Sequence, residues 1–365
     1  MQKNKKNKPG AKKFEVNAVF NIVEDINNKT YKPLRSECFI VKEPKIREVF
    51  CASFRDRIVQ HFVFNELNPV IEKILIFDAA NCRKSKGTDF AINRVFKFIR
   101  RETKNYTLPA YFLKLDLSGF FMNIDRQILL NQVLDIIWHK YEGKYRKELD
   151  FLVKIIILND VTKGAIRVTD IKEWDNLPTR KTLFNNSNGL PIGNICSQLF
   201  ANLYLNDIDH IVKSRHKSYS RYVDDFIIVD KQEYKLKLTK KLIESKLSNI
   251  NLQTNKNKTY IQNIKYGIPY LGIKIYPYYM ILDKQRIKRI YAGIRSFTTA
   301  EQAYPRVASR QGMFERYHGY KIMRSWYNKF PPNITERLKI SYGCRVRVKF
   351  FTYHSFCAYN MYYGK

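Results

Sequence analysis

The sequence is poor in acidic residues and has no long apolar run. Its 365 residues include 33 Asp and Glu against 66 Lys and Arg, a formal net charge of +33. Such self-repulsion is relieved when a polyanion binds, so nucleic acid is the leading partner and a membrane surface the competing one. No apolar run approaches the roughly 20 residues that span a bilayer. The start, MQKNKKNKPGAKKF, is also too polar for a signal peptide.

Closely spaced cysteines are also lacking. The six cysteines include no CxxC pair, which predicts neither a zinc site nor a disulfide framework: Cys38, Cys51, Cys82, Cys196, Cys344 and Cys357. The hydrophobic content of 45% is enough for a substantial core. Together with the length, it indicates two or three structural units.

The N-terminal third is basic and contains one hairpin signal. Residues 1–13 carry six lysines and no acid, which predicts a mobile arm. The stretch YKPLRSECFIVKEPKIREVF predicts a basic hairpin around a Pro-containing turn. Helical spacing of apolar residues follows in FRDRIVQHFVFNELNPVIEKIL, with a break expected at Pro69. A second helix is expected after CRKSKG.

The remaining two thirds alternate strand and helix signals. PAYFLKLD at 109–116 predicts a buried strand that ends in Asp116, and Asp125 is a candidate N-cap for the next helix. Residues 159–188 are polar and turn-rich, typical of an inserted loop or hairpin. One helix from Ile195 to Val212 and one strand at 268–276 are expected next. Residues 284–365, with 17 basic and three acidic residues, predict mostly helices.

Two adjacent aspartates stand between two strand-like segments in SRYVDDFIIVD. Side chains alternate along a hairpin, so we expect Asp224 and Asp225 to point in different directions. A hard cation such as Mg²⁺ would relieve their repulsion, and Asp116 is the best third carboxylate for a pair of sites about 3.5–4 Å apart. Two cations bound at such sites would support nucleotidyl transfer. Aspartate is also a common turn residue, so the pair alone does not decide between catalysis and a turn.

The order of four motifs resembles the palm of reverse transcriptases. LKLDLSGFF is followed by LPIGNICSQ, then by YVDDF, and then by a lysine before a YLG strand. The resemblance covers residues 31–282. It implies an α+β right-hand polymerase with fingers at 31–105, a palm at 106–282 and a helical thumb at 283–365, after an N-terminal arm at 1–30.

The resemblance also implies roles for individual residues. Asp116 and Asp224 would bind the catalytic metals, Mg²⁺ or Mn²⁺, with Asp225 supporting them. Lys258 would protonate the departing pyrophosphate, unless it is a simple surface lysine. Phe121 would exclude a ribose 2′-hydroxyl, although core packing is the competing role. Four basic residues would hold the incoming triphosphate, unless they are solvated surface charges: Lys45, Arg47, Arg83 and Lys86.

LPIGNICSQ departs from the Gln-Gly and Ser-Pro pairs of most bacterial reverse transcriptases. Ile192-Gly193 and Ser197-Gln198 stand there, and this resembles the enzymes of diversity-generating retroelements, which copy a template RNA with frequent errors at adenines. An apolar Ile192 in place of an amide would make the nucleotide pocket, with Gly193 and Gln198, less strict about pairing. A retron or abortive-infection reverse transcriptase and an idle RNA-binding scaffold are the alternatives.

The same resemblance implies the partners and the setting. The enzyme would bind template RNA, the cDNA duplex and deoxynucleoside triphosphates. It would also bind a small basic accessory protein that assembles as a ring. The protein would be bacterial or phage-encoded and cytoplasmic, with no membrane partner.

Overall fold

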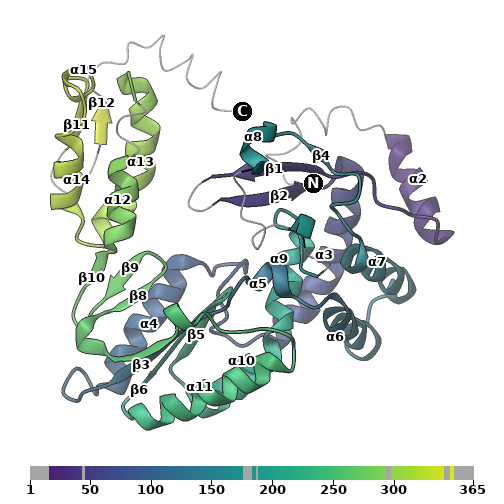
Figure 1. Ribbon diagram of the computed structural model, residues 1–365, viewed down its shortest axis with the longest axis horizontal. Helices are drawn as coiled ribbons and strands as arrows, with labels where there is room; N and C mark the ends of the chain where they lie inside the picture. The colour runs from purple at the N-terminus through teal and green to yellow at the C-terminus, as the bar shows by residue number, and fades with distance from the viewer. Residues whose placement is uncertain are drawn as a thin grey trace. The chain divides into compact units, whose positions relative to one another are not determined.

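The computed structural model describes residues 16–42, 46–175, 183–185, 188–292, 297–340 and 346–348 (Figure 1). The chain forms two compact units, the first from Met1–Arg94 with Tyr111–Ile261 and the second from Val95–Ala110 with Gln262–Lys365. The predicted basic arm at 1–13 lies outside the described residues, and so does Lys45. Among the residues that are described, no helix is both long enough and apolar enough to traverse a bilayer.

A four-stranded sheet in the order β5-β6-β3-β7 lies at the centre of the first unit. Its strands are β3 (Tyr111–Asp116), β5 (Tyr219–Tyr222), β6 (Asp225–Asp230) and β7 (Tyr260–Asn263). The β3 strand is predicted by its apolar run, and Phe112, Leu113 and Leu115 are fully buried. Such a run needs cover on both faces. Helices α10 (Asn206–Arg215) and α11 (Glu233–Ser248) run beside this sheet (Figure 1).

Helices from distant parts of the first unit share one apolar core. They are α2 (Val16–Asn27), α3 (Phe54–Ile74), α6 (Arg126–His139), α7 (Arg146–Leu158) and α9 (Ile195–Tyr204). The predicted N-cap is confirmed, because the Asp125 carboxylate accepts from the backbone N–H groups of Gln127 and Ile128. Helix α2, inside the segment treated as an arm, was not predicted.

Two predictions about helix ends are wrong. α3 continues through Pro69 to Ile74. Proline removes one helical hydrogen bond, but Leu67 and Ile71 on either side are fully buried and hold the helix in place. The single helix expected from Ile195 to Val212 is instead α9 and α10, which meet at Leu205.

The predicted basic hairpin is confirmed as β1 (Glu37–Val41) paired antiparallel with β2 (Arg47–Cys51). The inserted segment adds β4 (Ile166–Arg167), parallel to β1, and the short helix α8 (Ile171–Asp175). Residues 176–182 and 186–187 of that segment lie outside the described part. A short 3₁₀ turn, Leu183–Asn185, also belongs to it.

In the second unit the chain forms a small antiparallel sheet and a group of helices. The sheet has the order β10-β9-β8, from β8 (Ile268–Tyr270), β9 (Ile273–Ile275) and β10 (Met280–Leu282). The single strand expected at 268–276 is wrong, because Leu271 and Gly272 have φ of 52° and 77° and form a two-residue hairpin turn.

The helices expected after residue 284 are confirmed over much of that segment. They are α12 (Lys284–Ala292), α13 (Ala300–Arg316), α14 (Tyr320–Tyr327) and α15 (Pro332–Thr335). Fully buried Trp326 and Phe314 contact each other and anchor this group. A short pair, β11 (Leu338–Ile340) and β12 (Val346–Val348), follows. Helix α4 (Thr88–Glu102) begins in the first unit and ends in the second.

Candidate active site

The three aspartates singled out in the sequence lie together at one end of the central sheet. Asp116 is the last residue of β3 and is paired in register with Asp225, the first residue of β6. Asp225 is also opposite Tyr222, the last residue of β5. Val223 and Asp224 therefore form a two-residue turn directly beside Asp116.

That turn is strained, and a buried arginine holds it. Val223 has φ of 57°, a rare conformation for a β-branched residue. The Arg221 side chain is fully buried, and its guanidinium donates to the carbonyl of Val223 at 3.0 Å and to the Asp209 carboxylate at 2.6 Å. Arg221 and Asp209 were not predicted as positioning residues. The available signal was a charged residue within the strand-like segment just before the two aspartates.

Negative charge dominates the turn, and two lysines form ion pairs with the carboxylates beside it. Burial, with the charges of Asp225 and Asp116 added, raises the pKa of Asp224 to about 6. Lys258 Nζ lies 2.8 Å from Asp116 Oδ2, and Lys114 Nζ lies 3.8 Å from Asp225 Oδ1. Burial lowers the pKa of Lys258, but the hydrogen bond to Asp116 and the neighbouring carboxylates outweigh it and raise that pKa overall.

The carboxylates of Asp116, Asp224 and Asp225 are the type of ligand that a divalent cation prefers. Three carboxylates offer the oxygen ligands that hard cations prefer, and the raised pKa of Asp224 records a repulsion that a cation would relieve. In the described ranges, however, no three such side chains gather closely enough to hold a metal ion. The ammonium of Lys258 supplies the positive charge at Asp116 instead.

Ile192 and Gly193 lie where the LPIG segment contacts the β1–β2 hairpin, and the Leu190 N–H of the same segment donates to the Phe121 carbonyl. Phe121, on α5 (Phe120–Asn123), and Ile192 are half-buried and contact the same small core. The Phe50 N–H donates to the Ile192 carbonyl at 2.8 Å. Gly193 has φ of 119°, and a Cβ there would lie 2.5 Å from the Phe50 carbonyl oxygen, so this close approach requires glycine.

Gln198 connects α9 to the segment that follows α3. Its Oε1 accepts from Asn81 Nδ2 at 3.0 Å. That segment runs parallel to β5, with Ala79 bridged to Arg221. Gln198 therefore lies near the edge of the sheet at β5.

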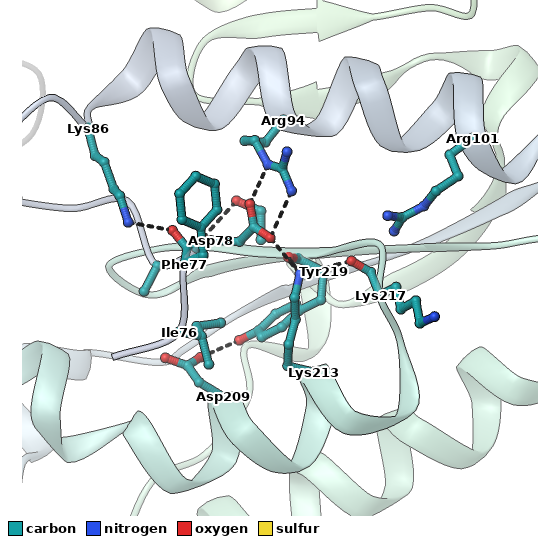
Figure 2. Close-up of polar contacts among 12 residues, drawn as sticks. Ile76, Phe77, Asp78, Lys86, Arg94, Arg101, Asp209, Lys213, Lys217 and Tyr219 are labelled. Atoms are coloured by element: carbon teal, nitrogen blue, oxygen red, sulfur yellow. Dashed lines mark hydrogen bonds and ion pairs between the residues drawn. The ribbon is translucent and has the colours of Figure 1, made fainter. Parts of the chain in front are cut away.

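Two of the basic residues predicted to hold a triphosphate, Arg83 and Lys86, have other contacts in this structure. Arg47 is exposed at the start of β2. Arg83 donates to Glu72 and to the carbonyls of Ile76 and Ala79. Lys86 donates to the Phe77 carbonyl at 2.7 Å (Figure 2), and burial and Arg83 lower its pKa. Triphosphate binding by Arg83 or Lys86 would require these bonds to be exchanged.

A buried carboxylate near Lys86 was not predicted. Asp78 is 1% exposed, and its side chain accepts from Arg94 and from Lys213, which come from two different helices (Figure 2). Its own backbone carbonyl accepts from the Arg221 N–H at 3.1 Å. Asp78 thus fixes the sheet edge from which Arg221 reaches the Val223 turn.

A sheet with three carboxylates at the ends of its central strands, flanked by helices, defines the palm of a right-hand polymerase. Residues 40–275 match the family described as "Reverse transcriptase (RNA-dependent DNA polymerase)". This match covers well over half of the chain, and the chain belongs to that family. Enzymes of this family normally use divalent metal ions.

One solved structure shows the same fold at low identity. The apo telomerase from Candida tropicalis is 11% identical with a TM-score of 0.50, over 82% of this chain and 57% of that one. A form truncated from the C-terminal domain is 13% identical with a TM-score of 0.49, over 68% and 55%. The chain thus spans little more than half the length of these proteins. A search of curated proteins finds no match.

Proposed function

We propose that this chain synthesises cDNA on a template RNA, with Asp116 and Asp224 binding two Mg²⁺ ions and Asp225 supporting them. The observation that carries the proposal is the register of the sheet, which pairs Asp116 with Asp225 next to the Asp224 turn. When bound, such cations activate the attacking hydroxyl and stabilise the charge on the leaving pyrophosphate.

The residues around the carboxylates would perform the remaining steps. Lys258, already 2.8 Å from Asp116, would hold a proton at its Nζ for the pyrophosphate. Phe121, at the LPIG contact, would exclude the 2′-hydroxyl of a ribonucleotide. Ile192, Gly193 and Gln198 would shape the pocket for the base pair. Lys45, Arg47, Arg83 and Lys86 would hold the triphosphate. The fingers, palm and thumb boundaries given above belong to the same proposal.

Primer extension on a defined RNA tests the activity. Asp224→Asn should reduce nucleotide incorporation by more than about 100-fold, beyond the usual loss on changing an outer-shell partner. Asp135→Asn, at a carboxylate that is 62% exposed on α6, is the matched control and should be as active as the wild type. Equal incorporation by Asp224→Asn and the wild type would contradict the role of Asp224 as a metal ligand, and no incorporation by the wild type would leave only the RNA-binding scaffold.

We further propose that the enzyme serves a diversity-generating retroelement. The support is the apolar Ile192, half-buried against the same small core as Phe121, at the position where other bacterial enzymes carry an amide. Ile192→Gln should lower the frequency of errors opposite template adenines in sequenced cDNA, and an unchanged frequency would reject this subfamily. Untemplated product from the wild type would favour the abortive-infection alternative. A cytoplasmic setting and a ring-forming basic accessory protein belong to this proposal.

A further inference from the structure

Two exposed tyrosines stand at the tip of the β9–β10 hairpin in the second unit. Met280 pairs with Ile275, and the Tyr276 N–H donates to the Tyr279 carbonyl at 2.8 Å, so Pro277 and Tyr278 form the turn. Tyr278 is 70% exposed and Tyr279 is 46% exposed. Exposed aromatic rings that are grouped on one surface form a candidate binding patch.

Each exposed ring is supported from behind by a second tyrosine. The Tyr278 ring lies 4.5 Å from that of Tyr106, and the Tyr279 ring stacks on that of Tyr276 at 4.8 Å with an angle of 18°. Tyr276 and Tyr279 are cross-strand neighbours, which explains their stacking. A supported ring loses little conformational freedom when a flat ligand stacks on its other side.

The loop that supplies Tyr106 is strained. Lys104, Asn105 and Tyr106 have φ of 49°, 58° and 69°, three successive non-glycine residues in the left-handed region. The loop is held by bonds between Arg100 and Asn105 in both directions, at 2.6 and 2.9 Å, and by Thr103 Oγ1, which accepts from the Tyr106 N–H. Strain that the surroundings hold in place is characteristic of functional segments.

The charge around these rings favours a polyanion. Residues 103–110 and 264–282 contain no Asp or Glu and three lysines, Lys104, Lys265 and Lys274. Lys274 Nζ lies 5.3 Å from the Tyr276 ring, and Lys265 Nζ lies 5.0 Å from the ring of Tyr266, which is 52% exposed. Tyrosines interleaved with lysines fit nucleic acid, where bases stack on rings and ammonium groups contact phosphates.

We propose that this tyrosine platform, Tyr106, Tyr276, Tyr278 and Tyr279, binds a single-stranded segment of the template RNA. Bases stack on Tyr278 and Tyr279, while Lys265 and Lys274 contact the phosphates. Stacking on a ring does not depend on the base, so binding is sequence-tolerant. The proposal deepens the proposed function, because it rests on the chain having an RNA template.

Fluorescence anisotropy with a labelled oligouridylate, in chelator and without nucleotides, tests the platform on the full chain. Tyr278→Ala should weaken binding about fivefold or more, the effect of losing one stacked base. Tyr278→Phe keeps the ring and should bind as the wild type does. Tyr234→Ala, at a tyrosine that is 57% exposed on α11, is the matched control and should also bind normally.

A second variant separates binding from folding. Tyr106→Gly relieves the strain at φ of 69° and removes the support of Tyr278, so it should weaken RNA binding without lowering the melting temperature. If Tyr278→Ala binds the oligonucleotide like the wild type, the platform proposal is overturned, and a protein would be the better occupant.

The outcome is distinguishable from a failure of the proposed function. Asp224→Asn should bind the oligonucleotide normally while losing incorporation. Normal incorporation by the wild type, together with normal RNA binding by Tyr278→Ala, would remove the platform and leave the polymerase. The opposite pattern, weak binding by Tyr278→Ala and no incorporation by the wild type, would remove the polymerase and leave the platform.

Discussion

At the scale of the single residue, Asp224 links stability to chemistry. Its carboxylate is half-buried at the tip of a strained turn and feels the charges of two other carboxylates, Asp225 and Asp116. Because the folded-state pKa is about 6 and the ordinary value is 3.8, the folded protein binds this proton more tightly than the unfolded chain does. Ionisation of Asp224 therefore lowers the free energy of unfolding progressively as the pH rises from 3.8 to 6.

Asp224→Asn should consequently stabilise the metal-free protein at pH 8. The gain is at most about 3 kcal/mol and smaller in practice, because water screens a half-buried group. It should largely disappear near pH 3, below the ordinary pKa of 3.8, where aspartate is mostly protonated in both states. Thermal unfolding in chelator at both pH values measures this. Asp135→Asn is the control, and an equal gain at both pH values would contradict the assignment of the pKa shift.

Gly193 offers a second test at this scale. Gly193→Ala should destabilise the protein by about 1–3 kcal/mol, because the new methyl group would meet the Phe50 carbonyl oxygen at a φ that alanine rarely adopts. Gly87→Ala is the matched control, since a Cβ there has nothing within 4 Å. Urea unfolding of both variants measures the difference. Equal effects would mean that the LPIG segment is not tightly held against β2.

At the scale of the element, the β5–β6 hairpin depends on the buried pair of Arg221 and Asp209. Arg221→Met should cost about 3–5 kcal/mol, because it leaves the fully buried Asp209 carboxylate without its ion-pair partner. The double variant with Asp209→Leu should recover much of that loss. Urea unfolding gives both values. A double variant that is no more stable than Arg221→Met would show that the pair is not the cause.

Elements were predictable where one local signal dominates. The apolar run of β3, the two strands of the first hairpin and the Asp125 cap each depend on a few residues, and all three are confirmed. Pro69 inside α3 and the turn at Leu271 depend on packing against distant segments, so local propensity misplaced them. The cations around Asp78 come from different helices, and no spacing in the sequence reveals them.

The candidate site was predictable for a related reason. The three aspartates stand at strand ends, so the sheet register alone brings them together. The Arg221 and Asp209 pair that positions the turn, and the contacts of Arg83 and Lys86, depend on side chains meeting across the fold. The sequence alone does not reveal those partners, because they come together only in the folded protein.

At the scale of the whole molecule, the charge of +33 should dominate RNA affinity. Neutralising 6–10 phosphates releases their counterions, so affinity should fall by about 10³–10⁵ between 50 and 200 mM salt. Titration of a labelled RNA by anisotropy at several salt concentrations measures the slope. Tyr278→Ala should weaken RNA binding by the same factor at every salt concentration, since tyrosine carries no charge. An affinity that does not respond to salt would contradict the electrostatic account.

Each of the two units is built from two separate stretches of the sequence, and this affects how recombination between related genes could exchange them. Because the first unit is encoded by two stretches that flank residues 95–110, and α4 crosses from one unit to the other, neither unit corresponds to a single block of gene. A single crossover within α4 would join halves of that helix from two different genes. A single crossover between residues 110 and 262 would take the two parts of the second unit, 95–110 and the sequence after 262, from different genes. Homologous exchange should therefore leave the two units inherited together.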